Sequence, residues 1–178
     1  MTTPTLQTIF RRRSIRVFTD QPVPPEHITT LLQAAMAAPS ARNGKPWEFV
    51  VVTQPEKLAE LRAHLTTGSF TAPLVISVLA NPAISDNPNA RKMFPQDCAN
   101  AMENLLLAAT DLGLGSCWVA NYPNEDRMAS VRLILGIPED VFPFCCAYVG
   151  YPGEEKPPRT QYDESRIHWQ AYDPLRHA

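Results

Sequence analysis

The chain lacks the sequence patterns of the most familiar catalytic and cofactor sites. It contains no GxGxxG fingerprint, no Walker A loop, no GxSxG elbow and no HExxH pair. No two of its histidines are spaced as a pair of metal ligands; they are His27, His64, His168 and His177. These absences argue against a Rossmann nucleotide site, a P-loop, a serine hydrolase and a zinc site. What remains is a bound cofactor that carries its own chemistry.

Long apolar runs and paired cysteines are also missing. No stretch is long enough to cross a bilayer, and no apolar run at the N-terminus resembles a signal peptide. The cysteines form no CxxC pair, and adjacent Cys145 and Cys146 would face opposite sides of a strand. We therefore expect a cytoplasmic protein with free thiols, at Cys98, Cys117, Cys145 and Cys146.

Charge of either sign is modest. Only 19% of residues are charged and the formal net charge is −2, whereas a general nucleic-acid binder normally carries a strongly basic face. With 44% hydrophobic residues, a chain of 178 residues suits one domain with a full core, spanning residues 1–178. The 18 prolines are an excess that gathers at segment borders and near the end.

Against this background, arginine is concentrated in one short stretch. Residues 11–18 read RRRSIRVF, with four arginines and a serine close together. A guanidinium group is a rigid fork of donors that matches phosphate oxygens, and serine adds a hydroxyl donor. The first hypothesis is therefore a small ligand that bears a phosphate. A solvated basic helix end, or a nucleic-acid contact, is the alternative from this stretch alone.

Hydrophobic periodicity predicts an alternation of helices and strands. Helices are expected over residues 4–12, from Pro24-Pro25 to Pro39-Ser40, and over residues 55–65, 97–112 and 124–135. Strands are expected over residues 47–53, 74–79, 116–121 and 142–149. We expect the first helix to turn Leu6, Ile9 and Phe10 inward. Residues 82–92 are expected to form a polar excursion.

The chain beyond residue 150 has no long apolar period, yet it is rich in aromatic residues. It carries the aromatic residues Tyr151, Tyr162, Trp169 and Tyr172, together with Ile167. A disordered tail rarely includes so many. We therefore expect residues 150–178 to form an arm that packs on another surface, with a second subunit as the favoured candidate.

Four segments, in this order, resemble the FMN-dependent nitroreductase family of the compact single-domain type. They are RRSIRVF at 12–18, APSARNGKPWEFVVV at 38–52, DCANAMENLLLAATDLGLGSCWVANYP at 97–123 and LGIPEDVFPFCCAYVGYPGEEKPPR at 135–159. The resemblance extends from about residue 6 to residue 169. It implies an α+β fold with a mixed, mostly antiparallel central sheet flanked by helices, and an intertwined homodimer with FMN sites at the interface.

The resemblance also implies which residues bind FMN. Arg12 and Ser14 match phosphate ligands, with Arg13 beside them. Arg16 matches a cation near the pyrimidine edge of the flavin, where a fixed positive charge would favour the anionic reduced ring. The other implied ligands are the partner-reaching loop residues Pro39, Ser40, Ala41 and Asn43, the backbone of Trp118, Val119 and Ala120 near flavin N5 and O4, and the late basic pair Lys156 and Arg159.

Without the resemblance, some of these residues have plainer interpretations. SARNGKP is then an ordinary helix-to-strand loop, and Lys156 and Arg159 are solvated charges in a proline-rich tail. Arg11 matches no role in the family and is interpreted as surface, and Trp47 as core.

The implied activity is a two-step transfer. NADH or NADPH gives a hydride to flavin N5 and leaves the site. An electron acceptor such as a nitroaromatic or a quinone then binds in place of the nicotinamide and is reduced. No side chain is expected to serve as a catalytic acid or base, and no metal is expected. Three alternatives stay open: another flavin task such as dehalogenation or flavin breakdown, a non-catalytic flavin-binding protein, and a nucleic-acid or phosphoprotein binder.

Two regions depart from the family pattern. Larger members use an asparagine and a lysine before the second strand, whereas residues 64–73 (HLTTGSFTAP) contain no lysine, so that contact is expected to be replaced or missing. Residues 81–95 are short and polar, which leaves the roof of the substrate pocket undefined.

Overall fold

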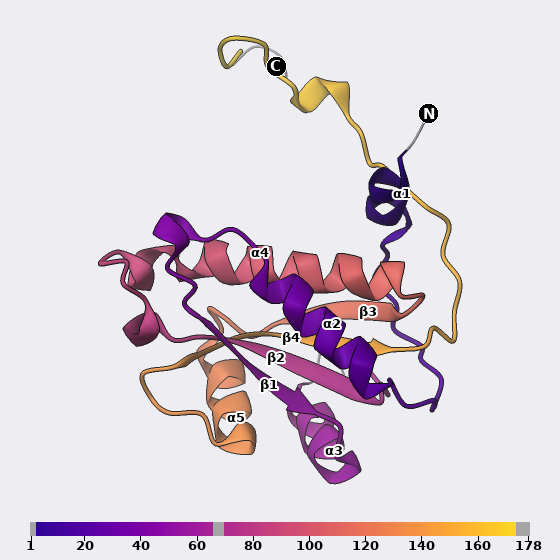
Figure 1. The fold of residues 1–178 in the computed structure, drawn as a ribbon, viewed down its shortest axis with the longest axis vertical. Helices are drawn as coiled ribbons and strands as arrows, with labels where there is room; N and C mark the ends of the chain where they lie inside the picture. The colour runs from indigo at the N-terminus through magenta and orange to yellow at the C-terminus, as the bar shows by residue number, and fades with distance from the viewer. Residues whose placement is uncertain (1–2, 66–69, 174–178) are drawn as a thin grey trace.

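The computed structural model describes residues 3–65 and 70–173, which form an antiparallel sheet between two layers of helices (Figure 1). The sheet contains four strands in the order β1-β2-β4-β3. These are β1 (Trp47–Val52), β2 (Leu74–Ala80), β3 (Gly115–Ala120) and β4 (Phe142–Gly150). The predicted fold class and all four predicted strands are thus confirmed. β1 and β3 lie at opposite edges of the sheet.

The helices divide between the two faces of the sheet. In the described residues they are α1 (Pro4–Arg11), α2 (Pro25–Met36), α3 (Pro55–His64), α4 (Ala90–Asp111) and α5 (Glu125–Leu135). α2 and α4 pack on one face, and α3 and α5 on the other (Figure 1). None of these helices is long and apolar enough to cross a membrane.

Residues in the strands alternate between the two cores, as strand geometry requires. Cys145 packs in the core beneath α2 and α4, and Cys146 in the core beneath α3 and α5. All four cysteines are buried free thiols, as predicted. Trp47 is buried as well, which confirms its interpretation as a core residue.

Helix α4 begins earlier than predicted. Its first residue is Ala90 rather than Asp97, and it includes Pro95. Part of the predicted polar excursion over residues 82–92 is therefore helical. Tertiary packing explains the difference: Phe94 is only 3% exposed, and its ring stacks on that of Phe142 with the centroids 5.0 Å apart. Burial of this ring outweighs the helix-breaking tendency of the proline.

Helix α1 forms as predicted, but its apolar face is not buried in this chain. Leu6 and Ile9 are 40% and 43% exposed, so the prediction that they turn inward is wrong for one chain; Phe10 is half-buried. α1 stands at the C-terminal end of α4, where Thr8 Oγ1 donates to Asp111 Oδ1 at 3.2 Å. This position leaves one side of α1 open.

The chain after β4 leaves the body of the molecule and passes α1 (Figure 1). The exposed fractions of Tyr162, Trp169 and Tyr172 are 71%, 74% and 73%. The prediction that this arm packs on a partner stays a prediction.

Candidate functional site

The arginine segment (residues 12–18) lies along the outer edge of β3. A parallel bridge joins Ser14 to Ser116, and the Ile15 N–H donates to the Ser116 carbonyl at 2.9 Å. Gly115 permits this close approach, because a β-carbon there would lie 2.8 Å from Ile15 Cγ2. The contacts with β3 thus fix the backbone of the arginine segment and the positions from which its side chains extend.

The chain after β4 holds the other side of the arginine segment. Glu154 Oε1 accepts the backbone N–H of Arg16 at 2.6 Å and that of Val17 at 3.3 Å. Lys156 Nζ donates to the Ser14 carbonyl at 2.7 Å and to Glu154 Oε1 at 2.9 Å. The hydrogen bond from the Arg16 N–H, followed by that from Lys156, lowers the pKa of Glu154.

Two guanidinium groups in the segment keep their charge uncompensated. The Arg13 guanidinium donates to the Pro157 carbonyl, and its buried Nε has no partner among the described residues. Arg16 Nη1 contacts the Ser14 carbonyl at 3.5 Å. Within residues 3–65 and 70–173, neither arginine forms an ion pair. Uncompensated guanidinium groups are suited to binding an anion.

The remaining basic residues near the segment have different surroundings. Arg12 Nε lies 3.1 Å from Glu103 Oε1 on α4. The backbone N–H of Arg159 donates to the Phe10 carbonyl at 3.1 Å, which brings this residue to the end of α1. Arg11 is exposed, as its interpretation as surface requires. The structure therefore brings the late basic pair, Lys156 and Arg159, to the arginine segment and the end of α1 beside it.

A small cavity of about 260 Å³ opens beside β3. It is lined by Arg16, Phe70, Cys117, Trp118, Val119, Ala120 and Arg127. Backbone groups of an edge strand alternate in direction, so Trp118 shares the outward orientation of Ser116. The Ser116 carbonyl is occupied by Ile15. The Trp118 N–H faces the edge beyond that contact, where a ligand can reach it, whereas the Trp118 carbonyl lies 3.8 Å from Cys117 Sγ.

Sequence reasoning missed Arg127, a second cation at this cavity. It lies in the first turn of α5, where its N–H donates to the capping Asn124 Oδ1 at 2.9 Å. Its Nη1 donates to the Ala120 carbonyl at 3.1 Å. The Asn124 cap was a local signal for the helix start, but the contact with β3 depends on the fold.

The loop that was expected to reach the partner's flavin lies at the opposite edge of the sheet. The loop with Pro39, Ser40, Ala41 and Asn43 packs on the N-terminal half of α4. It leads into β1, whereas the arginine segment docks on β3, and three strand spacings of about 4.8 Å separate these edges. Among the described residues, this loop contributes nothing to the lining of the cavity beside β3.

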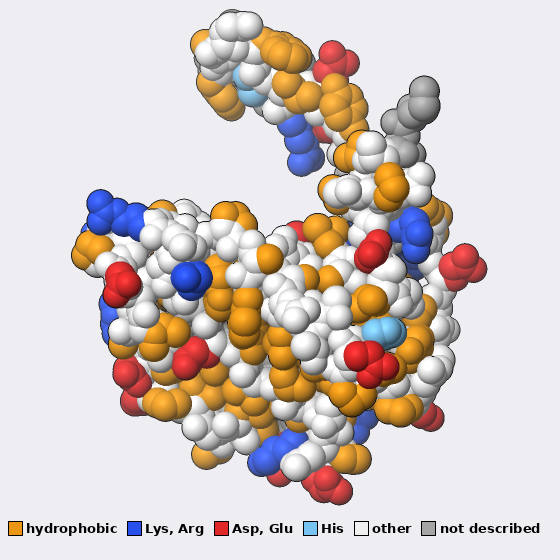
Figure 2. Space-filling model, in the orientation of Figure 1, with side chains coloured by type: hydrophobic (Ala, Val, Ile, Leu, Met, Phe, Trp, Pro, Cys, Tyr) orange, Lys and Arg blue, Asp and Glu red, His pale blue; other side chains and the backbone are white. Residues whose placement is uncertain are grey.

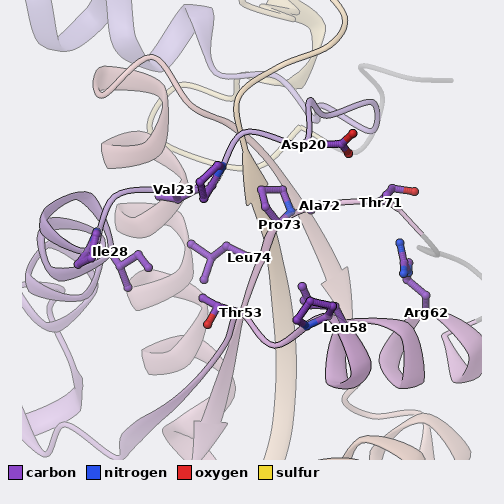
Figure 3. A pocket seen from close by; sticks show the side chains of 13 residues that line it. Asp20, Val23, Ile28, Thr53, Leu58, Arg62, Thr71, Ala72, Pro73 and Leu74 are labelled. Atoms are coloured by element: carbon purple, nitrogen blue, oxygen red, sulfur yellow. The ribbon is translucent and has the colours of Figure 1, made fainter.

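A larger cavity of about 580 Å³ lies between α2, α3 and the start of β2 (Figure 3). Its wall is mostly apolar, with Val23, Ile28 and Leu74 on one side. Asp20 and Arg62 are the ionisable groups among its described lining residues. It contains no residue of the arginine segment, so the cavity beside β3 is the better candidate site. Residues 66–69, in the stretch where a family lysine was sought, lie outside the described residues.

Comparison with known proteins places the chain in a family. The family model described as the Nitroreductase family matches residues 9–73 and 67–151. An Archaeoglobus fulgidus protein provisionally named NADH dehydrogenase/NAD(P)H nitroreductase is 43% identical over 168 residues, which cover 92% of this chain and 95% of that protein.

Solved structures agree with this match. A Bacteroides thetaiotaomicron protein with the same provisional name has a TM-score of 0.88 at 38% identity, covering 97% of this chain and 100% of that one. An FMN-dependent nitroreductase of Clostridium difficile R20291 has a TM-score of 0.82 at 30% identity, covering 93% and 98%. The matched region includes the arginine segment, the loop before β1 and strand β3. The chain belongs to the nitroreductase family.

Proposed function

We propose that this chain is an FMN-dependent oxidoreductase that passes a hydride from NADH or NADPH to an acceptor such as a nitroaromatic or a quinone. The observation that carries the proposal is the arginine segment at the edge of β3: within the described residues neither Arg13 nor Arg16 forms an ion pair, and Arg16 lines the cavity there. The relatives support it, since one is named an NAD(P)H nitroreductase and another an FMN-dependent nitroreductase.

The residues at this edge fit the phosphate of FMN. A phosphate monoester carries about −1.5 to −2 charges at pH 7 and offers three acceptor oxygens. Arg13 Nε and Ser116 Oγ are buried donors without a partner in the described residues, and such groups are rare in folded proteins unless a ligand or water completes them. Arg12, Ser14 and Lys156 add further donors nearby.

When bound, FMN would supply the hydride chemistry, and the protein would supply binding and electrostatics. Arg16 would favour negative charge at its end of the cavity. The outward N–H of Trp118 would orient a polar ring edge. No described lining residue of the cavity is a histidine, aspartate or glutamate, and burial raises the pKa of Cys117, with Arg16 and Lys156 opposing that shift. Protons would therefore come from water.

We also propose a homodimer in which the loop of one chain completes the site of the other. This would bring Pro39, Ser40, Ala41 and Asn43 to the partner's arginine segment, which they do not reach in their own chain. A groove of about 540 Å³ between α1, α2 and α4 supports a contact on this side. Figure 2 shows apolar side chains across the centre of the face on which α2 lies, and again on the C-terminal arm.

Absorption spectroscopy of the purified protein with added FMN tests the proposal. We expect flavin bands that stay with the protein through gel filtration and bleach under anaerobic NADH or NADPH. Bands that persist with both donors would leave a flavin-binding protein without this activity. Absence of flavin bands after FMN addition would refute the cofactor assignment. Reoxidation by a panel of nitroaromatics and quinones then tests the acceptor class.

A further inference from the structure

One acidic side chain lies inside the basic site, and its charge alone would oppose an anionic ligand. Glu154 contacts the backbone of the arginine segment from the side opposite β3. A carboxylate near a phosphate raises the cost of binding it. A role for Glu154 in this site must therefore come from the groups to which it is hydrogen-bonded.

Glu154 is hydrogen-bonded to the backbone of the arginine segment and to Lys156. A single oxygen, Oε1, accepts the N–H groups of Arg16 and Val17 and also a proton of Lys156 Nζ. Lys156 in turn donates to the carbonyl of Ser14. Between them, Glu154 and Lys156 satisfy backbone groups on both sides of Ile15, whose own N–H is bonded to β3.

The backbone also holds the arginine segment through contacts that involve neither Glu154 nor Lys156. The Val17 carbonyl accepts the Gly153 N–H at 2.8 Å, and the Thr19 N–H donates to the Tyr151 carbonyl at 2.9 Å. An antiparallel bridge also joins Phe18 to Pro152. Loss of the carboxylate should therefore loosen residues 14–17 while the fold is retained.

We infer that Glu154 is a positioning residue of the flavin site, and that its carboxylate fixes the backbone of residues 14–17 so that Arg13, Ser14 and Arg16 meet a phosphate-bearing cofactor. The inference rests on the proposed function. If only charge mattered, neutralising Glu154 would strengthen FMN binding, because it removes a negative charge from an anion site. The positioning role predicts the opposite change, a weaker affinity for FMN.

The test is an FMN titration of Glu154→Ala, Glu154→Gln and the wild type, followed by flavin fluorescence. Loss of several charge-assisted hydrogen bonds should weaken binding by about tenfold or more in Glu154→Ala. Glu154→Gln keeps an acceptor oxygen for the two N–H groups, so its affinity should lie between those of Glu154→Ala and the wild type.

Glu155→Gln is the matched control. It removes the same charge one residue away, at an exposed side chain that forms no ion pair with the residues described. It should therefore leave FMN affinity within about twofold of the wild type. Equal or tighter binding by Glu154→Ala, or equal losses in Glu154→Ala and Glu155→Gln, would overturn the inference.

Amide hydrogen exchange without FMN supplies a second readout. The Arg16 and Val17 amides should exchange faster in Glu154→Ala than in the wild type, while amides of β2 and β4 stay protected. Unchanged exchange at Arg16 and Val17 would refute the positioning role. A wild type that does not bind FMN would instead refute the proposed function, and the exchange result would still decide whether Glu154 orders the segment.

Discussion

Arg12 and Arg13 are neighbours with different surroundings. Arg12 pairs with Glu103, which is nearly half exposed, and such surface pairs contribute only about 0–1 kcal/mol to stability. Arg13 has a buried Nε that finds no partner in the part of the chain that the structure describes. The first arginine can therefore be replaced at little cost to the fold, whereas the second is tied to the interior of the segment.

Replacing Arg12 and Ser14 together with alanine should remove bound FMN and leave the protein folded. The flavin loses a guanidinium and a hydroxyl donor, while the backbone contacts of the segment remain. Flavin absorbance after gel filtration measures the loss, and the melting temperature should change by only a few degrees. Arg11→Ala, at an exposed arginine, should keep its flavin. A double variant with full flavin content would contradict the phosphate assignment.

Glu154 also predicts a pH dependence of stability. Its pKa is lowered in the folded chain, so its contacts stabilise the fold above its ordinary pKa of 4.5 and are lost as the pH falls through the lower folded value. The difference in melting temperature between the wild type and Glu154→Gln should be largest near neutral pH and shrink toward pH 3. A difference that grows with acidity would contradict this sign.

At the scale of the element, the loop before β1 depends on α4 and on the residues just before it. Arg42, Asn43 and Lys45 all have positive φ, a conformation that is uncommon for residues other than glycine. Two buried side chains support it. Asp97 Oδ1 accepts the Ala41 N–H at 2.8 Å, and Asn87 Nδ2 donates to the Ala41 carbonyl at 3.1 Å.

Asp97→Ala should destabilise the protein by about 1–3 kcal/mol, because it leaves the Ala41 N–H without its acceptor. Asp97→Asn keeps an acceptor oxygen and should lie closer to the wild type. Midpoints of urea unfolding give the comparison. If the alanine variant unfolded at the wild-type midpoint, Asp97 would not be what orders the loop.

Local patterns were sufficient to predict most elements, and long-range contacts account for the errors. Short apolar runs rich in β-branched and aromatic residues, bounded by turn signals, identified all four strands, and Asn124 and Gly136 mark the ends of α5. The start of α4 was missed because Pro95 is a local signal, while the burial of Phe94 against Phe142 is not.

The same distinction applies to the site. The arginine segment is unusual in composition and stands out in the sequence. The contact of Glu154 with this segment cannot be predicted from sequence spacing, because it joins residues far apart in the chain. The contact of Arg127 with β3 cannot be predicted either, because it depends on how α5 packs beside the strand.

At the scale of the whole molecule, the proposed homodimer would cover the exposed side of α1. Ile9 on α1 and Leu107 on α4 both line the groove between these helices. Burying such side chains at a subunit contact would add the hydrophobic stabilisation that one chain lacks.

Ile9→Glu combined with Leu107→Glu should convert the protein to monomers and lower its flavin content. Light scattering after gel filtration gives the mass, and absorbance gives the flavin. Leu133→Glu is the control, since Leu133 is 82% exposed on α5, on the other face of the sheet, and should leave both unchanged. A double variant that stays dimeric would exclude this groove as the interface.

The separation of the arginine segment and the loop on opposite edges of one sheet has a further consequence. On the proposed dimer, each site would take one motif from each chain, so two defective proteins could repair each other. Arg12→Ala and Asn43→Ala homodimers would both be deficient, yet each mixed dimer would contain one site with both motifs intact. Unfolding and refolding the two variants together should restore about a quarter of the sites, whereas mixing them without subunit exchange should restore none.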